Sequence, residues 1–253
     1  MRYIGIIPAR FQSSRFPGKP LCTIGDKSMI EHVCTQVRKV KRLEKVIVAT
    51  DHEGIARSVQ AFGGEVCMTS ANHRSGTERC AEVFRGLLPS FPPEETTVIN
   101  IQGDEPFIQP AQIEELISRM ETHQAGIGTL VLPLTDPSDL SNANVVKVVR
   151  DKNGNALYFS RSAIPFMRSA TFGEIPFYKH IGMYAYRGDV LLEIVGQPAS
   201  PIEKAESLEQ LGWLYNGFDI ATQITRYPTN IAIDTPEDLE KANAYYRQIH
   251  PEK

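Results

Sequence analysis

Short apolar runs alternate with amphipathic stretches along the first half of the chain. Three of these runs, at residues 3–8, 45–50 and 97–101, have the length of strands, and each gives way to polar residues. Between the runs, apolar residues recur at i, i+3, i+4 and i+7, which lays one face of a helix on a sheet. Two sets with this spacing are Ile30, Val33, Cys34, Val37 and Ile113, Leu116, Ile117, Met120. The alternation predicts βαβ units around a mostly parallel sheet.

The alternation of strand-like runs and amphipathic helical stretches changes from about residue 126. Strand-like runs follow one another there with few helices between them, at 127–133, 145–149, 156–160 and 181–186. These runs predict that the second half extends the sheet. The intervening segment 168–176 contains Gly and small polar residues, so we expect a loop that moves or joins a subunit contact.

The loop that leaves the first run carries three cations within ten positions. Arg10, Arg15 and Lys19 can surround the phosphates of a nucleotide. Ser13, Ser14 and free backbone N–H groups add uncharged donors. A solvated basic loop is the ordinary alternative for three such cations, so the flanking sequence has to decide between the two interpretations.

Two carboxylates are predicted where strands end. Asp104 follows the run 97–101, and Asp234 follows the strand-like run 230–233. Ligands of open α/β sheets bind outside the carboxyl ends of the strands. Magnesium is satisfied by one or two carboxylates together with waters and substrate phosphates. Taken separately, Asp104 also fits a turn former, and Asp234 also fits the start of a helix capped by the following Thr-Pro.

Composition narrows the function mainly by exclusion. The 253 residues, 42% of them hydrophobic, can bury a large core, and the net charge of −3 gives no general attraction to nucleic acid or anionic membranes. The four cysteines are scattered without a C-x-x-C pair, so we interpret them as core or surface fillers of a protein in a reducing compartment. No apolar stretch approaches the roughly 18 residues of a membrane span. These features favour the cytoplasm.

Seven motifs, taken in order, give the chain a resemblance to a known family. They are Pro-Ala-Arg with Ser-Ser-Arg-Phe-Pro-Gly-Lys-Pro-Leu (8–21), Ala-Thr-Asp-His (49–52), Ser-Gly-Thr-Glu-Arg (75–79), Gln-Gly-Asp-Glu-Pro (102–106), Leu-Tyr-Phe-Ser-Arg (157–161), Leu-Glu-Gln-Leu (208–211) and Asp-Thr-Pro-Glu-Asp-Leu (234–239). The set resembles the 3-deoxy-manno-octulosonate cytidylyltransferases, or CMP-Kdo synthetases. That family transfers CMP from CTP to the sugar acid Kdo for lipopolysaccharide synthesis. One departure is Phe11-Gln12, where family members commonly carry Tyr or other residues.

The resemblance implies an α/β, Rossmann-like nucleotide-diphospho-sugar transferase fold. Its central sheet would be mixed and mostly parallel, flanked by helices, with a smaller lobe for sugar binding and dimerisation. A single domain over 1–253 is expected, with CTP bound by about 1–125 and the sugar and dimer contacts within about 126–230. The remainder, about 231–253, would supply the strand end with a metal ligand and a closing helix. A cytoplasmic homodimer without nucleic-acid partners or membrane insertion follows.

The resemblance also implies the site residues. Those for CTP are Ala9, Arg10, Ser13, Arg15, Lys19, Arg74, Ser75 and Gln102. Those for the sugar acid are Gln102, Arg161, His180, Tyr184, Glu209 and Gln210. Asp104 and Asp234 would hold Mg²⁺ and, with Lys19, form the catalytic set; no residue is assigned as general base. Two ordinary alternatives stay open, because Ser75 with Glu78 also fits a capping box and an isolated His180 is more often a surface or core residue.

Two other functions compete with this interpretation. A different activated-sugar nucleotidyltransferase is disfavoured because sugar-1-phosphate enzymes usually open with a Gly-x-Gly loop, which this chain lacks. A non-catalytic nucleotide-binding protein would be expected to lose Lys19, Asp104 or Asp234, and all three are present. A dinucleotide oxidoreductase is a still poorer third alternative, because no G-x-G-x-x-G follows the first run. Kdo and a close variant such as an 8-amino derivative remain alternatives for the sugar.

Overall fold

The chain folds into two compact units. The computed structural model describes residues 1–12, 15–169, 171–228 and 231–250. One unit comprises Met1–Glu114 with the C-terminal segment Thr229–Lys253, and the other comprises Glu115–Pro228. The boundary between Glu114 and Glu115 falls inside helix α4 (Pro110–Thr122), so this helix contributes residues to both units.

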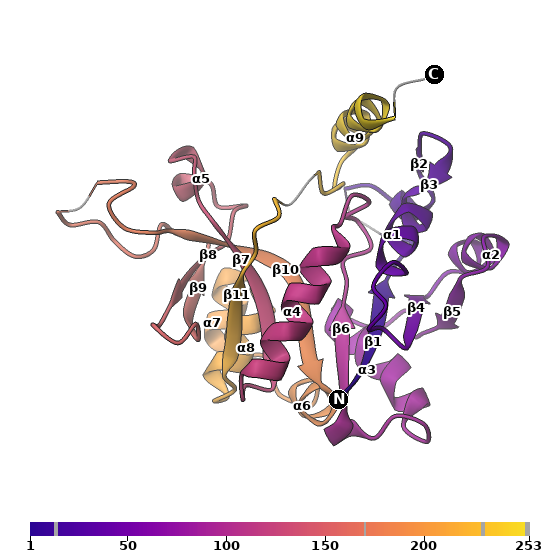
Figure 1. The fold of residues 1–253 in the computed structure, drawn as a ribbon, viewed down its shortest axis with the longest axis horizontal. Helices are drawn as coiled ribbons and strands as arrows, with labels where there is room; N and C mark the ends of the chain where they lie inside the picture. Colours follow the sequence, from indigo (N-terminus) through magenta and orange to yellow (C-terminus); the bar gives the residue numbers. More distant parts are fainter. Residues whose placement is uncertain (13–14, 170, 229–230, 251–253) are drawn as a thin grey trace. The chain divides into compact units, whose positions relative to one another are not determined.

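Four parallel strands form the sheet of the first unit (Figure 1). In spatial order they are β6 (Thr96–Asn100), β1 (Arg2–Pro8), β4 (Lys45–Thr50) and β5 (Glu65–Met68). The central strand β1 buries Ile4, Ile6 and Ile7 completely. The apolar runs at 3–8, 45–50 and 97–101 are therefore confirmed as parallel strands, and their carboxyl ends open at one edge of this sheet.

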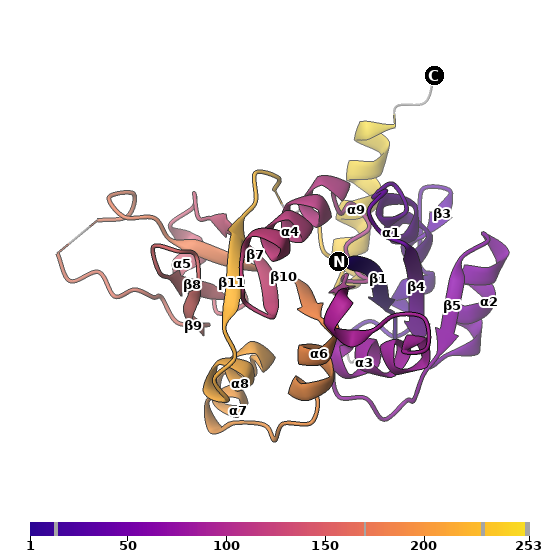
Figure 2. The same ribbon diagram turned by 60° about the horizontal axis from the view of Figure 1, so that its bottom comes forward.

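Three helices cover the two faces of this sheet. They are α1 (Met29–Val37), α2 (Glu53–Ala61) and α3 (Gly76–Leu87). Helix α3 lies against β1 and β6, and α1 lies on the opposite face (Figure 2). The 3₁₀ helices η1 (Lys19–Leu21) and η2 (Pro93–Glu95) and the short strands β2 (Thr23–Ile24) and β3 (Lys27–Ser28) complete the connections. This doubly covered arrangement is the one predicted from the amphipathic spacing.

The C-terminal segment closes the first unit. Helix α9 (Pro236–Ile249) begins with a capping box of Thr235 and Asp238, as its Thr-Pro start predicts. The predicted strand at 230–233 is wrong over its described part, since residues 231–234 form no strand. The backbone N–H of Ile233 instead donates one hydrogen bond to the carbonyl of Asp104, at 3.0 Å. A single backbone bond and a helix cap therefore place Asp234.

The second unit is built on antiparallel pairs. In spatial order its strands are β11 (Ile220–Ile224), β7 (Ile127–Pro133) and β10 (Tyr178–Arg187), with β8 (Lys147–Arg150) paired to β10 and β9 (Ala156–Ser160) paired to β8. Only the β11–β7 pair is parallel within this unit's described pairings. Its helices are α5 (Ser138–Ser141), α6 (Gly188–Ile194), α7 (Pro201–Glu206) and α8 (Glu209–Tyr215). The four strand-like runs predicted after residue 126 are thus confirmed.

The state of the cysteines and the character of the described helices can be compared with what the composition predicts. All four cysteines are free thiols, two of them buried and two half-buried. Burial raises the pKa of the Cys34 thiol to about 12, so this thiol stays protonated and packs as an apolar side chain. Among the helices described, none combines the length and apolar character that crossing a membrane requires.

Candidate active site

The basic loop is folded back on itself where it reaches Lys19. Gly18 has a φ of 75°, a left-handed conformation that favours glycine. Its N–H donates to the carbonyl of Phe11 at 2.8 Å, which brings the two ends of the loop together. Lys19 then begins the 3₁₀ helix η1. The Pro-Gly-Lys sequence thereby sets the direction in which the Lys19 side chain leaves the backbone.

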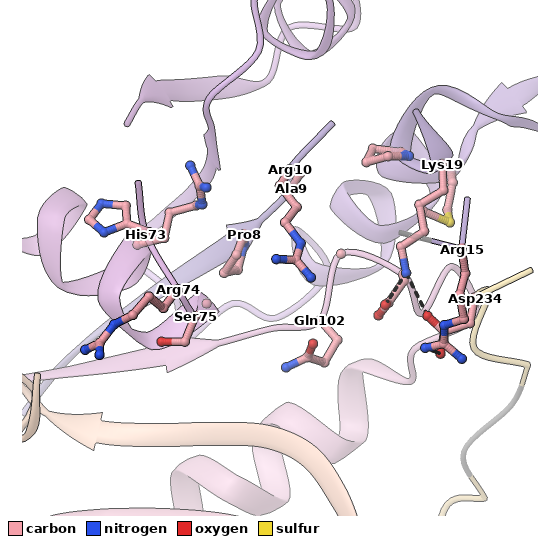
Figure 3. Close-up of a pocket in the computed structure, with 16 residues that line it drawn as sticks. Pro8, Ala9, Arg10, Arg15, Lys19, His73, Arg74, Ser75, Gln102 and Asp234 are labelled. Carbon is pink, nitrogen blue, oxygen red and sulfur yellow. Dashed lines mark hydrogen bonds and ion pairs between the residues drawn. The ribbon is translucent and has the colours of Figure 1, made fainter. Parts of the chain in front are cut away.

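The Lys19 ammonium joins the two predicted metal ligands (Figure 3). It lies 2.6 Å from Oδ2 of Asp104 and 3.1 Å from Oδ1 of Asp234, and it also donates to the carbonyl of Ile233 at 3.0 Å. The side chain of Lys19 is only 14% exposed. Two carboxylates from distant parts of the chain therefore converge on one largely buried cation. Next to Asp104, burial and the charge of Asp104 raise the pKa of Glu105 to about 7.

The two remaining cations of the loop differ in their pairing. Arg15 donates from Nη2 to Oδ2 of Asp234 at 2.9 Å, and its side chain is largely exposed. No carboxylate of the described residues lies within ion-pair distance of Arg10, which points into the same space as Ser75 and Gln102 (Figure 3). The site therefore carries a positive charge that the described carboxylates do not neutralise, which suits an anionic ligand.

The residues predicted for the nucleotide and the metal gather around one pocket of about 250 Å³ in the first unit. The predicted residues that line it are Ala9, Arg10, Arg15, Lys19, Arg74, Ser75, Gln102, Asp104 and Asp234. Ser13, also predicted for CTP, lies outside the described residues. Four separate sequence motifs thus supply one pocket at the carboxyl edge of the parallel strands.

Residues that the sequence interpretation missed also line this pocket. Arg79 is 3% exposed and bonds through Nη2 to Asp51 at 3.0 Å, so the first turns of α3 are tied to the end of β4. A Cβ atom on Gly103 would lie 2.6 Å from the carbonyl oxygen of Pro8, so only glycine permits this close approach. Both residues stand inside motifs that carried the resemblance, which was the available signal. His73, to which no role was given, lines the pocket as well.

The start of α3 combines a cap with a pocket wall. The hydroxyl of Ser75 accepts from the N–H of Glu78 at 3.2 Å, which confirms the predicted N-cap. The carboxylate of Glu78 accepts the backbone N–H of Arg74 at 2.8 Å and two guanidinium bonds of the same arginine at 2.8 and 2.6 Å. Ser75 is therefore a cap and a pocket residue at once, as the two interpretations of the sequence together allowed.

The other residues predicted for the sugar acid belong to the second unit, and Arg161 is the most constrained of them. Its guanidinium donates to the backbone carbonyls of Glu206 at 2.7 Å, Ala143 at 3.0 Å and Ser207 at 3.4 Å. Its backbone N–H donates to the Glu206 carboxylate at 2.9 Å. Arg161 thus joins the end of β9 to the backbone at residue 143 and at residues 206–207, a structural role that the sequence interpretation did not include.

His180 and Tyr184 meet because β10 is irregular between them. In a regular strand, residues four apart are separated by roughly 13 Å. The pairing of β10 with β7 shifts register between Ile181 and Tyr184, and the rings of His180 and Tyr184 lie 5.2 Å apart. Oγ1 of Thr129 lies 3.1 Å from Nε2 of His180 and fixes that ring. The irregularity therefore builds a cluster that strand periodicity does not predict.

This cluster holds a buried hydroxyl without a hydrogen bond. The Tyr184 hydroxyl has no partner among the described residues. Burial, and secondarily the charge of Glu209, raise the pKa of Tyr184 well above its ordinary value. Gln210 is 5% exposed, and Glu209 is half-buried at the start of α8. Gln210 is therefore a buried polar residue near the start of α8.

Acid should weaken this cluster through His180. Burial lowers the pKa of His180 from 6.5 to about 3, whereas an unfolded histidine titrates near 6.5. Protons therefore bind the unfolded chain preferentially below pH 6.5, and up to about 2 kcal/mol of stability is lost between pH 7.5 and 5. Urea unfolding at both pH values should show this loss reduced in His180→Asn. Equal pH dependence of the two proteins would contradict a neutral, buried His180.

Comparisons with known proteins match this fold and pocket over nearly the whole chain. The cytidylyltransferase family model matches residues 4–224. The 3-deoxy-manno-octulosonate cytidylyltransferase of Parabacteroides distasonis is 50% identical over 97% of this chain and 98% of its own length. The protein of that name from Thermodesulfovibrio yellowstonii is 47% identical over 94% and 96%.

A solved structure extends the match to three dimensions. It is a CMP:2-keto-3-deoxy-manno-octonic acid synthetase complexed with CTP, with a TM-score of 0.92 and 40% identity, covering 98% of this chain and 100% of the solved one. This match confirms the expected α/β nucleotidyltransferase fold with a mostly parallel sheet flanked by helices. The chain therefore belongs to the cytidylyltransferase family, and within it to the 3-deoxy-manno-octulosonate cytidylyltransferases.

Proposed function

We propose that this cytidylyltransferase transfers CMP from CTP to the anomeric hydroxyl of Kdo and releases diphosphate. The sugar oxygen attacks the α-phosphorus, the bond to the β-phosphate breaks, and the hydroxyl proton leaves to solvent or a base. The observation that carries the proposal is the convergence of three loop cations with two carboxylates in one pocket. Nucleotidyl transfer needs little else from the protein than positioning and charge neutralisation.

Asp104 and Asp234 are the residues that would hold Mg²⁺. Their carboxylates already share one cation, the Lys19 ammonium, so the donor set fits a second small cation. Magnesium commonly uses two carboxylates and completes its shell with waters and substrate phosphates. When bound, the metal supplies positive charge at the α-phosphate and lowers the pKa of the attacking hydroxyl.

The side chains around these carboxylates divide the remaining work. Arg10, Arg15 and Lys19 would neutralise the negative charge that grows on the departing diphosphate. Arg74 and Ser75, on the far side of Arg10 in Figure 3, would face the cytidine. Cytosine differs from uracil by an exocyclic amino donor and a ring nitrogen acceptor, both of which backbone groups there can bind.

The cluster in the second unit would bind the sugar acid. The buried Tyr184 hydroxyl lacks a partner among the described residues, and a sugar hydroxyl would satisfy it. Arg161 has five N–H donors, and the backbone carbonyls occupy three of them, so two remain for a carboxylate. His180 would act as a neutral hydrogen-bonding group because its pKa is about 3.

A cytoplasmic homodimer that supplies CMP-Kdo for lipopolysaccharide completes the proposal. Leu157 and Tyr158 on β9 and Phe166 in the following loop are exposed apolar side chains, the last with 85% of its surface accessible. Among the described strands, β9 forms a ladder with β8, and Asn155 just before it bridges Ala221 of β11. The exposed apolar side chains, and not a free strand edge, would therefore meet a second chain. Family membership supports the place in lipopolysaccharide synthesis and the cytoplasmic location.

Diphosphate release tests the proposal directly. Each of the four nucleoside triphosphates is supplied with Mg²⁺, with and without Kdo, and release is measured. We expect release only with CTP and Kdo together, because the sugar hydroxyl is the nucleophile that displaces diphosphate. Removal of the metal with EDTA should abolish release, and added Mg²⁺ should restore it. Activity with CTP and only another 2-keto sugar acid would overturn the assignment of Kdo, and no release with any pair would overturn the transfer itself.

A further inference from the structure

Phe11 lies at the base of the loop that carries Lys19. Its ring stacks on the ring of His52, with centroids 3.9 Å apart and planes 15° from parallel. Neither Phe11 nor His52 lines the pocket. The two rings therefore form a contact beside the candidate active site but outside it.

Three further contacts hold Phe11 in place. Its N–H donates to Oδ1 of Asp51 at 3.4 Å, and its carbonyl accepts the N–H of Gly18 at 2.8 Å. A Cβ atom on Gly18 would lie 3.2 Å from the Phe11 ring, so the backbone of Gly18 also lies close to that ring. Phe11 is thus held by its backbone and by both of its ring contacts.

The residues that contact Phe11 are held by contacts of their own. The other oxygen of Asp51 accepts from the buried guanidinium of Arg79 at 3.0 Å. The side chains of this ion pair are only 4% exposed for Arg79 and 13% exposed for Asp51. His52 caps helix α2, its Nδ1 accepting the N–H of Gly54 at 3.1 Å. An anchor fixed by a helix cap and a shielded ion pair can set the position of the loop.

From these contacts we propose that Phe11 is a positioning residue for the Lys19 ammonium. The stack on His52 and the bond from Gly18 fix where the left-handed turn at Gly18 lies, and Lys19 follows immediately at the start of η1. A shift of this turn would move the ammonium away from Asp104 and Asp234, 2.6 and 3.1 Å distant. The inference rests on the proposed function only in that Lys19 contacts the triphosphate.

Equilibrium binding of CTP and tryptic cleavage test the inference without the transfer reaction. We expect Phe11→Ala to weaken CTP binding about tenfold by calorimetry and to speed cleavage after Arg15 about tenfold, since the loop loses its anchor. His52→Ala should act in the same direction. Phe11→Tyr, which keeps the ring, should bind CTP within about twofold of wild type. Phe62→Ala, at a half-buried phenylalanine outside the pocket, is the matched control.

A double-mutant cycle distinguishes positioning from general support of the fold. If Phe11 acts through Lys19, then Phe11→Ala should weaken CTP binding little further in a Lys19→Ala background. Additive losses, or wild-type affinity and cleavage in Phe11→Ala, would overturn the inference. Should wild type bind CTP and yet transfer CMP to no sugar acid, the proposed function would fail while the same cycle would still decide the role of Phe11.

Discussion

We expect Asp104→Asn to lower kcat of CMP transfer by at least about a thousandfold, and Asp234→Asn to do the same. Each substitution removes one of the two negative charges that converge at the pocket, while the size of the side chain is kept. Losing a ligand of a catalytic metal, or the charge that aligns it, costs about this much or more. Steady-state release of diphosphate from CTP and Kdo measures the effect.

The stability of the two variants should stay close to wild type. Asp104 and Asp234 are 28% and 41% exposed, so their ion pairs with Lys19 are partly screened by solvent. Unfolding temperatures within about 3 °C of wild type are therefore expected. Mn²⁺ binding in the presence of CTP, followed by electron paramagnetic resonance, should weaken in both variants and not in Asp219→Asn, a control at an exposed residue. Substantial turnover in either variant would contradict the proposal that Asp104 and Asp234 hold the metal.

The first unit could be predicted well from sequence because its site is local to strand ends. The runs 45–50 and 97–101 are strands to within a residue, and the polar residues that follow them meet at one edge. The sequence also predicted that Asp104 and Asp234 would meet. The predicted reason, a strand ending before Asp234, was wrong: residues 231–234 form no strand, and one backbone hydrogen bond ties this segment to Asp104. A short apolar segment does not reveal whether it pairs along its length or at one point.

The second unit was less predictable because its contacts depend on irregular backbone. Periodicity cannot show that β10 shifts register between Ile181 and Tyr184, and so it gave no reason for His180 and Tyr184 to touch. Arg161 was expected to face a ligand, and its carbonyl contacts are invisible in the sequence. The sequence likewise gives no sign of the role of Lys147, since a lysine within a valine-rich strand is ordinarily the residue that faces solvent.

Lys147 is in fact completely buried, and its ammonium is enclosed by backbone carbonyls. It donates to the carbonyls of Asn142 at 2.9 Å, Val145 at 2.6 Å and Arg161 at 2.5 Å. Burial lowers the pKa of this lysine, with smaller contributions from nearby charges. The ammonium thus joins the segment before β8 to the end of β9, where Arg161 leaves the strand.

Lys147→Met should therefore destabilise the protein by about 3 kcal/mol or more, because methionine fills most of the volume but leaves three buried carbonyls without their donor. A fall in the unfolding temperature of at least about 6 °C follows for a chain of this size. Because Arg161 loses the bond at its carbonyl, KM for Kdo should rise about tenfold while KM for CTP stays within about twofold. Thermal unfolding and steady-state kinetics measure both, with Lys152→Met, at an exposed lysine on the β8–β9 turn, as control. A Lys147→Met protein as stable as wild type would show that the three carbonyls do not need the ammonium, and an equal rise in both KM values would show that Lys147 does not act through Arg161.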